Sequence, residues 1–287
     1  MCPSLWALVA LFPLVCGVRL QDVNFTVPVV DPHSIPGLGN LVGSSSDLEQ
    51  GFASQLAELV MNAPDDCDIC KGKFKWQFIV GTGRSGTTTT LMMIDAIPGY
   101  YLTGENDNLV NNLQQIYVDM MSRKAPVEGA FRRDGVIPEH RVLCGMQEMV
   151  KLSLGEFDEE HVTTIGFKEI RFKTEEDLAF LQKLFPCAKF IVVTRRNPSD
   201  AVGSGWWNEK NIDDMMKNSR VLQAWQSSHE PIAFPLQLED FSVERFNEML
   251  KWLGVSGCEY TDVGHSNKGG YSDGRDTVKM NGTCVSH

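Results

Sequence analysis

The sequence has no excess of positive charge and no apolar run long enough for an ordinary membrane span. Its 287 residues include 26 lysines and arginines against 37 aspartates and glutamates, which gives a net charge of −11. A nucleic-acid-binding protein needs cations to neutralise phosphates, so this balance argues against nucleic acid as a partner. It also argues against general attraction to anionic membranes, but a small anionic ligand needs only a few well-placed cations.

The longest apolar run extends from Leu5 to Val18 and is shorter than the roughly 20 residues that cross a bilayer. It has the length of the hydrophobic part of a signal peptide, and small residues stand near its end, at Val15–Gly17. No basic segment precedes it, so a cleaved signal, an uncleaved anchor and a buried core segment all stay open. We expect a signal over residues 1–17, an irregular arm over residues 18–73 and one domain over residues 74–287. A membrane would be a partner only if the signal stayed uncleaved.

Cysteine usage bears on the compartment. Eight cysteines are present, of which two fall in the signal region and six remain. Six cysteines allow fifteen connectivities, and we expect Cys258 to pair with Cys284 because both lie in the irregular C-terminal tail. Disulfides behind a signal indicate the secretory pathway, either the Golgi lumen or secretion. N-glycosylation triplets at Asn24 and Asn281 support that route weakly.

The segment Cys67-Asp68-Ile69-Cys70 has the spacing of a redox motif or of half a zinc site. No second such pair exists in the sequence, and the six histidines show no ligand spacing, so we expect no metal. A structural disulfide, either local or to another cysteine, is the favoured interpretation.

From Phe74 onward, predicted strands and helices alternate, with no internal repeat. We expect strands at residues 76–80, 100–102, 163–167, 189–194 and 231–238. We expect helices at residues 87–97, 109–121, 141–154, 175–185, 199–207 and 243–253, with another at residues 47–62 in the arm. Such alternation predicts an α/β fold of three layers, in which helices cover both faces of a parallel sheet.

The sharpest motif is Gly81-Thr82-Gly83-Arg84-Ser85-Gly86-Thr87-Thr88, between a predicted strand and a predicted helix. Glycines let a backbone close around an anion, and the amides at a helix start point toward it. The spacing nearly matches the nucleotide-binding pattern GxxxxGK[ST], but Thr87 replaces the lysine and the cation moves to Arg84. A kinase would lack the lysine for its β- and γ-phosphates, so ATP hydrolysis is disfavoured. The expected anion ligands are Gly83, Arg84, Ser85, Gly86, Thr87 and Thr88.

The segment from Phe78 to Glu105 resembles the 5′-phosphosulfate loop of sulfotransferases that use 3′-phosphoadenosine 5′-phosphosulfate (PAPS). It is most similar to the protein-tyrosine sulfotransferases and related Golgi-type enzymes, which share Arg-Ser-Gly-Thr-Thr and, about one helix later, Gly-Glu. In this sequence those motifs are Arg84–Thr88 and Gly104-Glu105. The resemblance implies a P-loop-NTPase-like sulfotransferase fold, with PAPS as the co-substrate and no metal.

A second motif follows the most apolar predicted strand. Arg196 and Ser204 have the spacing of the family's 3′-phosphate motif, an arginine at a strand end and a serine eight residues later. An arginine fork and a hydroxyl can hold a phosphate monoester between them. Arg195 carries the same charge but is one residue out of register. Lys268 lies in a segment that loosely resembles the C-terminal loop closing over this phosphate in cytosolic sulfotransferases, although a plain flexible tail is the favoured alternative.

The same resemblance implies catalytic residues. Glu105 is the candidate base for the acceptor's proton, with His140 as a weaker alternative. Arg84 and Lys168 would stabilise the charge that develops on the sulfuryl group. A surface pair between Lys168 and its neighbour Glu169 is the alternative interpretation of that strand-end cluster.

The predicted activity is transfer of a sulfuryl group from PAPS to an acceptor hydroxyl or amine. Arg171, near Lys168 in the chain, would serve the acceptor or the nucleotide. Glycans, protein tyrosine and small alcohols all stay open as acceptors, and the acidic net charge favours a neutral or sparsely charged one. Two other functions stay open: a P-loop transferase or kinase acting on a small hydroxyl substrate, and a secreted nucleotide-binding protein without catalysis. The sequence predicts no particular oligomeric state.

Overall fold

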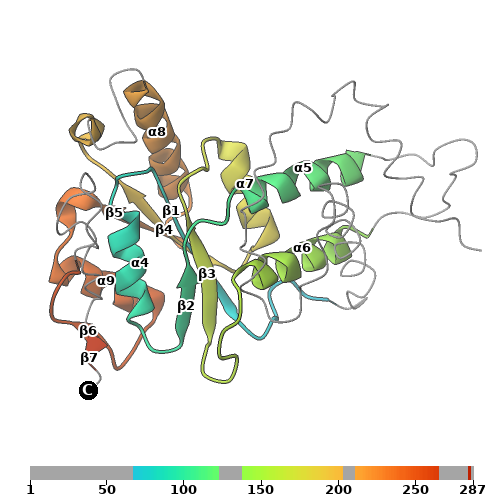
Figure 1. Cartoon of the computed structure of the whole chain (residues 1–287), viewed down its shortest axis with the longest axis horizontal. Helices are drawn as coiled ribbons and strands as arrows, with labels where there is room; N and C mark the ends of the chain where they lie inside the picture. The colour runs from blue at the N-terminus through green and yellow to red at the C-terminus, as the bar shows by residue number, and fades with distance from the viewer. Residues whose placement is uncertain (1–66, 123–137, 203–210, 265–283, 286–287) are drawn as a thin grey trace, which may run out of the picture. The chain divides into compact units, whose positions relative to one another are not determined.

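The computed structural model describes residues 67–122, 138–202, 211–264 and 284–285. These residues form a five-stranded parallel sheet in the order β2-β3-β1-β4-β5, with helices on both faces (Figure 1). The architecture confirms the predicted three-layer α/β fold. The predicted signal, most of the arm and the predicted helix at 47–62 lie outside the described residues.

Each strand of the sheet lies close to its predicted position. The strands are β1 (Lys75–Gly81), β2 (Tyr100–Thr103), β3 (Thr164–Glu169), β4 (Lys189–Thr194), β5 (Ala233–Gln237), and the short antiparallel pair β6 (Glu259–Tyr260) and β7 (Cys284–Val285). The helices are α4 (Thr87–Asp95), α5 (Leu109–Ser122), α6 (Glu139–Ser153), α7 (Glu175–Leu184), α8 (Ile212–Ser228), α9 (Val243–Leu253) and the 3₁₀ helices η2 (Pro198–Ala201) and η3 (Leu238–Asp240). Within the described part of the chain, no helix is both long and apolar enough to cross a membrane.

Alternation of side chains along the buried strands produces two apolar cores. Phe78 and Val80 of β1 pack with α5, α6, α7 and α8, whereas Ile79 between them packs with α4 and α9 on the opposite face. Figure 1 shows α4 and α9 together on one side of the sheet. Because both faces of the sheet are covered, β4 is buried on both sides, which explains its uninterrupted apolar run from Phe190 to Val193.

Two elements after β4 differ from the sequence prediction. The predicted helix at 199–207 is wrong in its described part, because η2 makes a single turn that ends at Ala201 and the backbone of Val202 is extended. Helix α8 is missing from the prediction, although Met215, Leu222 and Trp225 recur at helical spacing and are buried.

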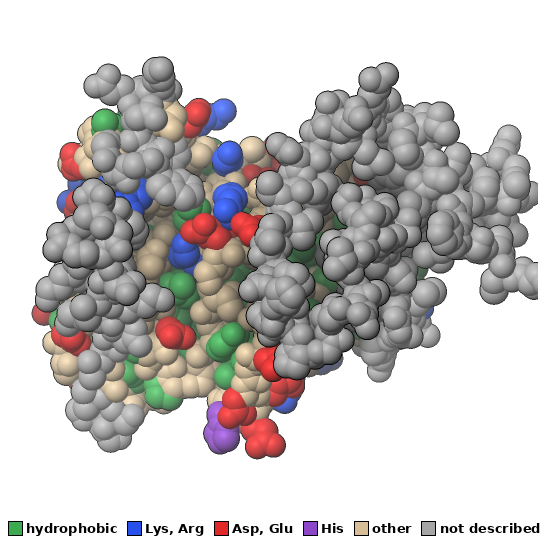
Figure 2. All heavy atoms as spheres, in the orientation of Figure 1, with side chains coloured by type: hydrophobic (Ala, Val, Ile, Leu, Met, Phe, Trp, Pro, Cys, Tyr) green, Lys and Arg blue, Asp and Glu red, His purple; other side chains and the backbone are tan. Residues whose placement is uncertain are grey.

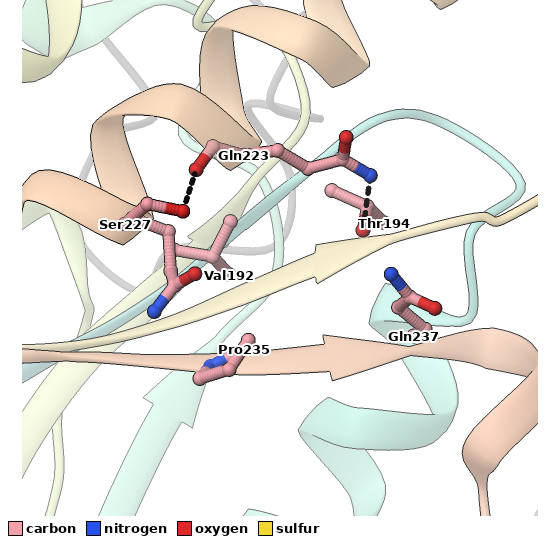
Figure 3. A pocket seen from close by; sticks show the side chains of 7 residues that line it. Val192, Thr194, Gln223, Ser227, Pro235 and Gln237 are labelled. Carbon is pink, nitrogen blue, oxygen red and sulfur yellow. Dashed lines mark hydrogen bonds between the residues drawn. The ribbon is translucent and has the colours of Figure 1, made fainter. Parts of the chain in front are cut away.

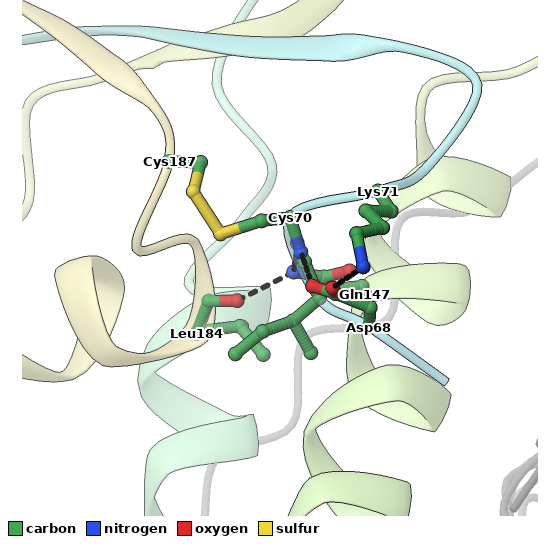
Figure 4. Close-up of a disulfide and its surroundings, with 7 residues drawn as sticks. Asp68, Cys70, Lys71, Gln147, Leu184 and Cys187 are labelled. Atoms are coloured by element: carbon green, nitrogen blue, oxygen red, sulfur yellow. Dashed lines mark hydrogen bonds and ion pairs between the residues drawn. A yellow bond between two sulfur atoms is a disulfide. The ribbon is translucent and has the colours of Figure 1, made fainter. Parts of the chain in front are cut away.

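Disulfides link the Cys67–Cys70 segment to two other parts of the fold, and Figure 4 shows one of them, the Cys70–Cys187 bond. Cys67 bonds to Cys144 of α6, and Cys70 bonds to Cys187 between α7 and β4. Gln147 of α6 reinforces the junction, since its side-chain amide donates to the carbonyls of Ile69 at 3.1 Å and Leu184 at 2.7 Å. The disulfides are therefore long-range, and the alternative of a local bond within the segment is wrong.

The C-terminal segment is held against α4 and α9. Cys258 pairs with Cys284, as predicted, beside the β6–β7 pair. The hydroxyl of Tyr260 donates to the carbonyl of Met93 in α4, and Asn247 of α9 exchanges two hydrogen bonds with the backbone of Tyr260, at 2.8 and 3.0 Å. These contacts anchor the segment to the same core that supports the start of α4.

Candidate functional site

The strand order predicts where a ligand binds. The connection from β1 leads to β2 on one side of the sheet, and the connection from β4 leads to β5 on the other side. In open α/β sheets, ligands bind outside the carboxyl ends of the strands at the point where the connections diverge, here between β1 and β4. Figure 2 shows basic and acidic side chains close together on the visible face, so charges of both signs share this surface.

The predicted phosphate loop leads from β1 into α4. Its backbone is left-handed at Arg84, with φ of 67°, and at Gly86, with φ of 88°. The hydroxyls of Thr82 and Ser85 are hydrogen-bonded to each other and buried, which closes the turn. Gly86 precedes α4 and supplies no side-chain cap, and the first turn of α4 holds no acidic residue. Neither Gly86 nor the first turn of α4 thus supplies a carboxylate cap to the amides at the start of this helix, which suits an anion site.

Gly86 is also where η3 approaches the loop. A Cβ atom built at Gly86 would lie 2.7 Å from the Phe241 ring and 2.8 Å from the Leu238 side chain. Glycine at this position thus meets two requirements at once, the positive φ and the close packing of the β5–α9 connection. Thr87 is buried behind the loop and Thr88 is exposed.

Glu105 and Lys168 are brought together from different strands. Lys168 lies in β3, beside Ile79 of β1, and its alternation places it on the face that carries α4. Its ammonium forms an ion pair with Oε1 of Glu105, in the turn just after β2. The Lys168 side chain is 8% exposed and that of Glu105 is 24% exposed, so solvent screens this pair only partly. The alternative pairing of Lys168 with Glu169 is wrong, because Glu169 points to the opposite face.

Arg171 extends this pair into a network. Its guanidinium lies 3.7 Å from Oε2 of Glu105, 3.4 Å from Asp107 and 3.5 Å from Glu169. Glu169 is 1% exposed, and burial raises its pKa even though the amides of Ile170 and Arg171 and the Arg171 charge act in the other direction. Glu169 is therefore a buried member of the site. The sequence had suggested it only as the partner of Lys168 in a surface ion pair.

The two arginines after β4 lie in different surroundings. Arg196 is 56% exposed and donates to Asp240 at 2.7 Å and to Gln237 at 3.2 Å. Arg195 is only 19% exposed, and its Nε lies 3.9 Å from Glu239. Burial alone would raise the pKa of Glu239, but the backbone amides that donate to it, including that of Arg196, hold the pKa below its usual value.

Some predicted ligands cannot be placed. Ser204 and Lys268 lie outside the described residues, so the structure does not test the spacing of Arg196 with Ser204. His140, the alternative base, is an exposed residue in the first turn of α6, far along the chain from the strand ends that carry the network. Across the described ranges, no group of three His, Cys, Asp or Glu side chains is placed to hold a metal ion.

A separate cavity of about 260 Å³ lies between α8 and the ends of β4 and β5 (Figure 3). Its lining is neutral and is formed by Val192, Thr194, Gln223, Gln226, Ser227, Pro235 and Gln237. Gln223 already donates to Thr194 at 3.4 Å, and Ser227 donates to the Gln223 carbonyl at 2.9 Å. Val192 in its lining lies on the face of the sheet that carries α8, whereas Lys168 lies on the face that carries α4, so this cavity is distinct from the Glu105–Lys168 pair.

The model of the Sulfotransferase family matches residues 77–230, which is more than half of the chain. The matched region begins in β1 and ends after α8, so it includes the phosphate loop, the Glu105–Lys168 pair and both arginines after β4. Among curated protein sequences, none matches this chain.

Solved structures give weaker similarities. The sulfotransferase domain of the Synechococcus PCC 7002 olefin synthase is 14% identical, with 68% of this chain and 76% of that chain covered and a TM-score of 0.38. Sulfotransferase STF1 from Mycobacterium tuberculosis H37Rv is 12% identical, with 74% and 77% covered and a TM-score of 0.39. A sulfotransferase from Alicyclobacillus acidocaldarius is 14% identical, with 64% and 82% covered and a TM-score of 0.39. The family assignment therefore depends on the match over residues 77–230.

Proposed function

The chain belongs to the sulfotransferase family, and on that basis we propose that it transfers a sulfuryl group from PAPS to a hydroxyl or amine of an acceptor. The observation that carries the proposal is the ion pair of Glu105 with Lys168, at strand ends beside a loop suited to phosphate. A carboxylate and a cation side by side provide the two functions that the transfer needs, a proton acceptor and a stabiliser of negative charge.

The described residues fit the two anionic ends of PAPS. The loop from Gly81 to Gly86 offers backbone amides and the Arg84 cation to the phosphosulfate end. The turn after β4 offers Arg195 and Arg196 to the 3′-phosphate, with Ser204 proposed from the sequence alone. Because β1 and β4 are adjacent strands, these two anion sites are neighbours at the same edge of the sheet.

The reaction follows from the positions of these groups. When bound, PAPS supplies the electrophilic sulfur and its leaving group. Glu105 accepts the acceptor's proton as the acceptor oxygen or nitrogen forms a bond to sulfur. The bond between sulfur and the phosphate oxygen breaks, and that oxygen leaves with the electron pair. Lys168 and Arg84 offset the charge that moves onto the sulfuryl and leaving oxygens.

The compartment and the acceptor class belong to the same proposal. The three disulfides and the N-terminal apolar run support a place in the secretory pathway, in the Golgi lumen or outside the cell. The net charge of −11 supports a neutral or sparsely charged acceptor over a polyanionic one. Neutral glycans, tyrosine peptides and small alcohols are the classes to be tested.

The test is incubation of the full chain with sulfur-labelled PAPS and a panel of acceptors. The panel comprises a neutral oligosaccharide, a tyrosine-containing peptide, simple alcohols and an amine. We expect label to be transferred to one class, and we expect adenosine 3′,5′-bisphosphate (PAP), the product nucleotide, to raise the melting temperature.

Two outcomes would replace the proposal. Stabilisation by ATP rather than by PAP would indicate a kinase or another phosphoryl transferase. Binding of PAP without transfer to any acceptor would indicate a nucleotide-binding protein without catalysis. The Glu105→Gln variant provides the control, because it should still bind PAP while losing transfer.

A further inference from the structure

Glu169 is a buried carboxylate that the proposed reaction does not use directly. It is the last residue of β3, and its Oε1 accepts hydrogen bonds from the backbone amides of Ile170 at 2.8 Å and Arg171 at 3.0 Å. Its Oε2 is buried and has no hydrogen-bond partner within the described residues. A charge in such a place is costly to bury, so its position calls for a functional explanation.

The only cation that contacts Glu169 among the described groups is Arg171. The Arg171 Nη1 lies 3.5 Å from Oε1 of Glu169 and is itself buried, with no hydrogen bond in the described structure. On its other side, Nη2 donates a hydrogen bond to Asp107 at 3.4 Å and lies 3.7 Å from Oε2 of Glu105. Three carboxylates therefore compete for one guanidinium, and none of them forms a close bidentate pair with it.

The competition affects Glu105 in particular. Its Oε1 is engaged by Lys168, which leaves Oε2 as the oxygen for the acceptor's proton. A guanidinium that closed onto Oε2 would form a short, charge-assisted pair, and a carboxylate held in that way is a poorer base. The 3.7 Å separation keeps Oε2 beyond hydrogen-bond distance of Arg171.

We propose that Glu169 is a positioning residue that holds Arg171 back from Glu105, so that Oε2 of Glu105 stays free to accept a proton. The inference rests on the proposed function, in which Glu105 is the base. In this role Glu169 acts only through Arg171, the cation that it contacts among the described residues.

The test is a double-mutant cycle on transfer activity. Glu169→Gln keeps an oxygen for the two backbone amides but removes the charge that attracts Arg171. We expect kcat to fall about tenfold while PAP affinity and the KM for PAPS change less than about twofold. In an Arg171→Gln background, the same change should alter kcat less than about twofold, because no guanidinium is left to close onto Glu105.

A control removes a carboxylate from a different arginine. Glu248 is exposed and pairs with Arg245 at 2.7 Å, outside the network of Glu105, Lys168 and Arg171, so we expect Glu248→Gln to leave kcat within about twofold. An equal loss from Glu169→Gln in both backgrounds, or no loss in either, overturns the inference.

A crystal structure of the Glu169→Gln variant tests the geometry without any assay. We expect the separation of Arg171 Nη2 from Oε2 of Glu105 to shorten from 3.7 Å to about 2.8 Å. An unchanged separation overturns the inference even if the wild-type chain transfers sulfate. The two proposals can also fail separately. If the distance from Arg171 Nη2 to Glu105 Oε2 shortens in the variant but the wild-type chain transfers sulfate to no acceptor, the effect of Glu169 on Arg171 is supported and only the proposed function fails.

Discussion

The carboxylate of Glu105 and the ammonium of Lys168 form an ion pair although the two residues are 63 positions apart in the sequence. They meet because β2 and β3 are neighbouring parallel strands whose carboxyl ends lie at the same edge of the sheet. Glu105 follows the end of β2, and Lys168 is the penultimate residue of β3. The pair therefore depends on the register of the sheet and not on any local turn.

Replacing Glu105 by glutamine should separate catalysis from folding. The amide keeps an oxygen for Lys168 but cannot take a proton, so we expect kcat to fall by about 10² to 10⁴. PAP affinity should change less than about twofold, and the free energy of unfolding should fall by about 1–2 kcal/mol. Labelled-PAPS kinetics, PAP titration and urea unfolding measure the three quantities.

Glu139→Gln is the matched control for this prediction. Glu139 is also paired with a lysine, Lys183 at 2.6 Å, but the pair is exposed at the start of α6. Surface pairs contribute little, so kcat should stay within about twofold. Full activity in Glu105→Gln would remove this residue from the mechanism.

Gly86→Ala should weaken nucleotide binding more than it weakens the fold. The new methyl group would meet Phe241 and Leu238 at 2.7 and 2.8 Å, at a backbone φ of 88° that alanine disfavours. The loop must shift to relieve both conflicts, and its amides then no longer point at one anion. We expect PAP affinity to fall at least about tenfold, or about 1.4 kcal/mol, in a calorimetric titration.

Gly254→Ala is the control for Gly86→Ala, because it introduces a positive-φ strain on alanine without a steric clash. Gly254 has φ of 77°, but nothing lies within 4 Å of a Cβ atom built there. Alanine at this helix C-terminus should lower the free energy of unfolding by about 1 kcal/mol and leave PAP affinity unchanged. Equal losses of PAP affinity in the two variants would show that the Gly86 environment has no special role.

The fold was predictable wherever a local pattern decides the structure. The short apolar runs Phe78–Val80 in β1 and Phe190–Val193 in β4 predict strands buried on both faces, and both predicted strands agree with the structure to within one residue. The phosphate loop was predictable for the same reason, since its glycines, strand and helix are contiguous in the chain. Helix α8 is missing from the prediction because its buried face includes the polar Asn218 and Ser219, although Asn211, a residue type that often caps helices, stands at its N-terminus.

The partners of charged residues were not predictable, because they depend on strand order. The sequence suggested pairing Lys168 with Glu169, but alternation along β3 places these neighbours on opposite faces. Only the order β2-β3-β1 shows that Glu105 is the residue beside Lys168. The partners of Cys67 and Cys70 likewise follow from the packing of α6 and α7, and not from cysteine spacing.

Removing the Cys70–Cys187 disulfide should reduce stability without changing the site. The bond links residues 117 positions apart, so it restricts a long loop of the unfolded chain. We expect the Cys70→Ser/Cys187→Ser variant to lose about 2–5 kcal/mol of unfolding free energy in urea. The affinity for PAP should be retained, because both cysteines lie away from the carboxyl ends of the strands.

The Cys258→Ser/Cys284→Ser variant gives the comparison for loop length. This bond spans only 26 residues, so its loss should cost less than the loss of the longer one. The reverse order of stabilities would mean that the anchoring of Tyr260 against α4, and not loop entropy, sets the contribution of the shorter bond.

The buried charge of Glu169 should make the stability of the protein depend on pH in a recognisable direction. Burial raises the pKa of Glu169 above its ordinary value near 4.5, with the amide of Ile170 and the charge of Arg171 opposing the shift. A carboxyl group whose pKa is higher in the folded state binds a proton more readily there than in the unfolded chain. Its contribution to stability is therefore fully present below the unfolded pKa and is lost as the pH rises through the folded pKa.

Glu169→Gln removes this titration. Urea unfolding of both proteins should give equal or greater stability for the variant at about pH 7.5, and the difference in its favour should shrink toward about pH 4.5. If the charged form of Glu169 instead stabilised the fold through its contacts, the opposite pH dependence would result. Glu169→Gln would then lower the stability most at neutral pH, where the carboxylate is charged. A Glu169→Gln variant that is much less stable than the wild type at neutral pH would falsify the view that this buried charge serves to position Arg171 and does not stabilise the fold.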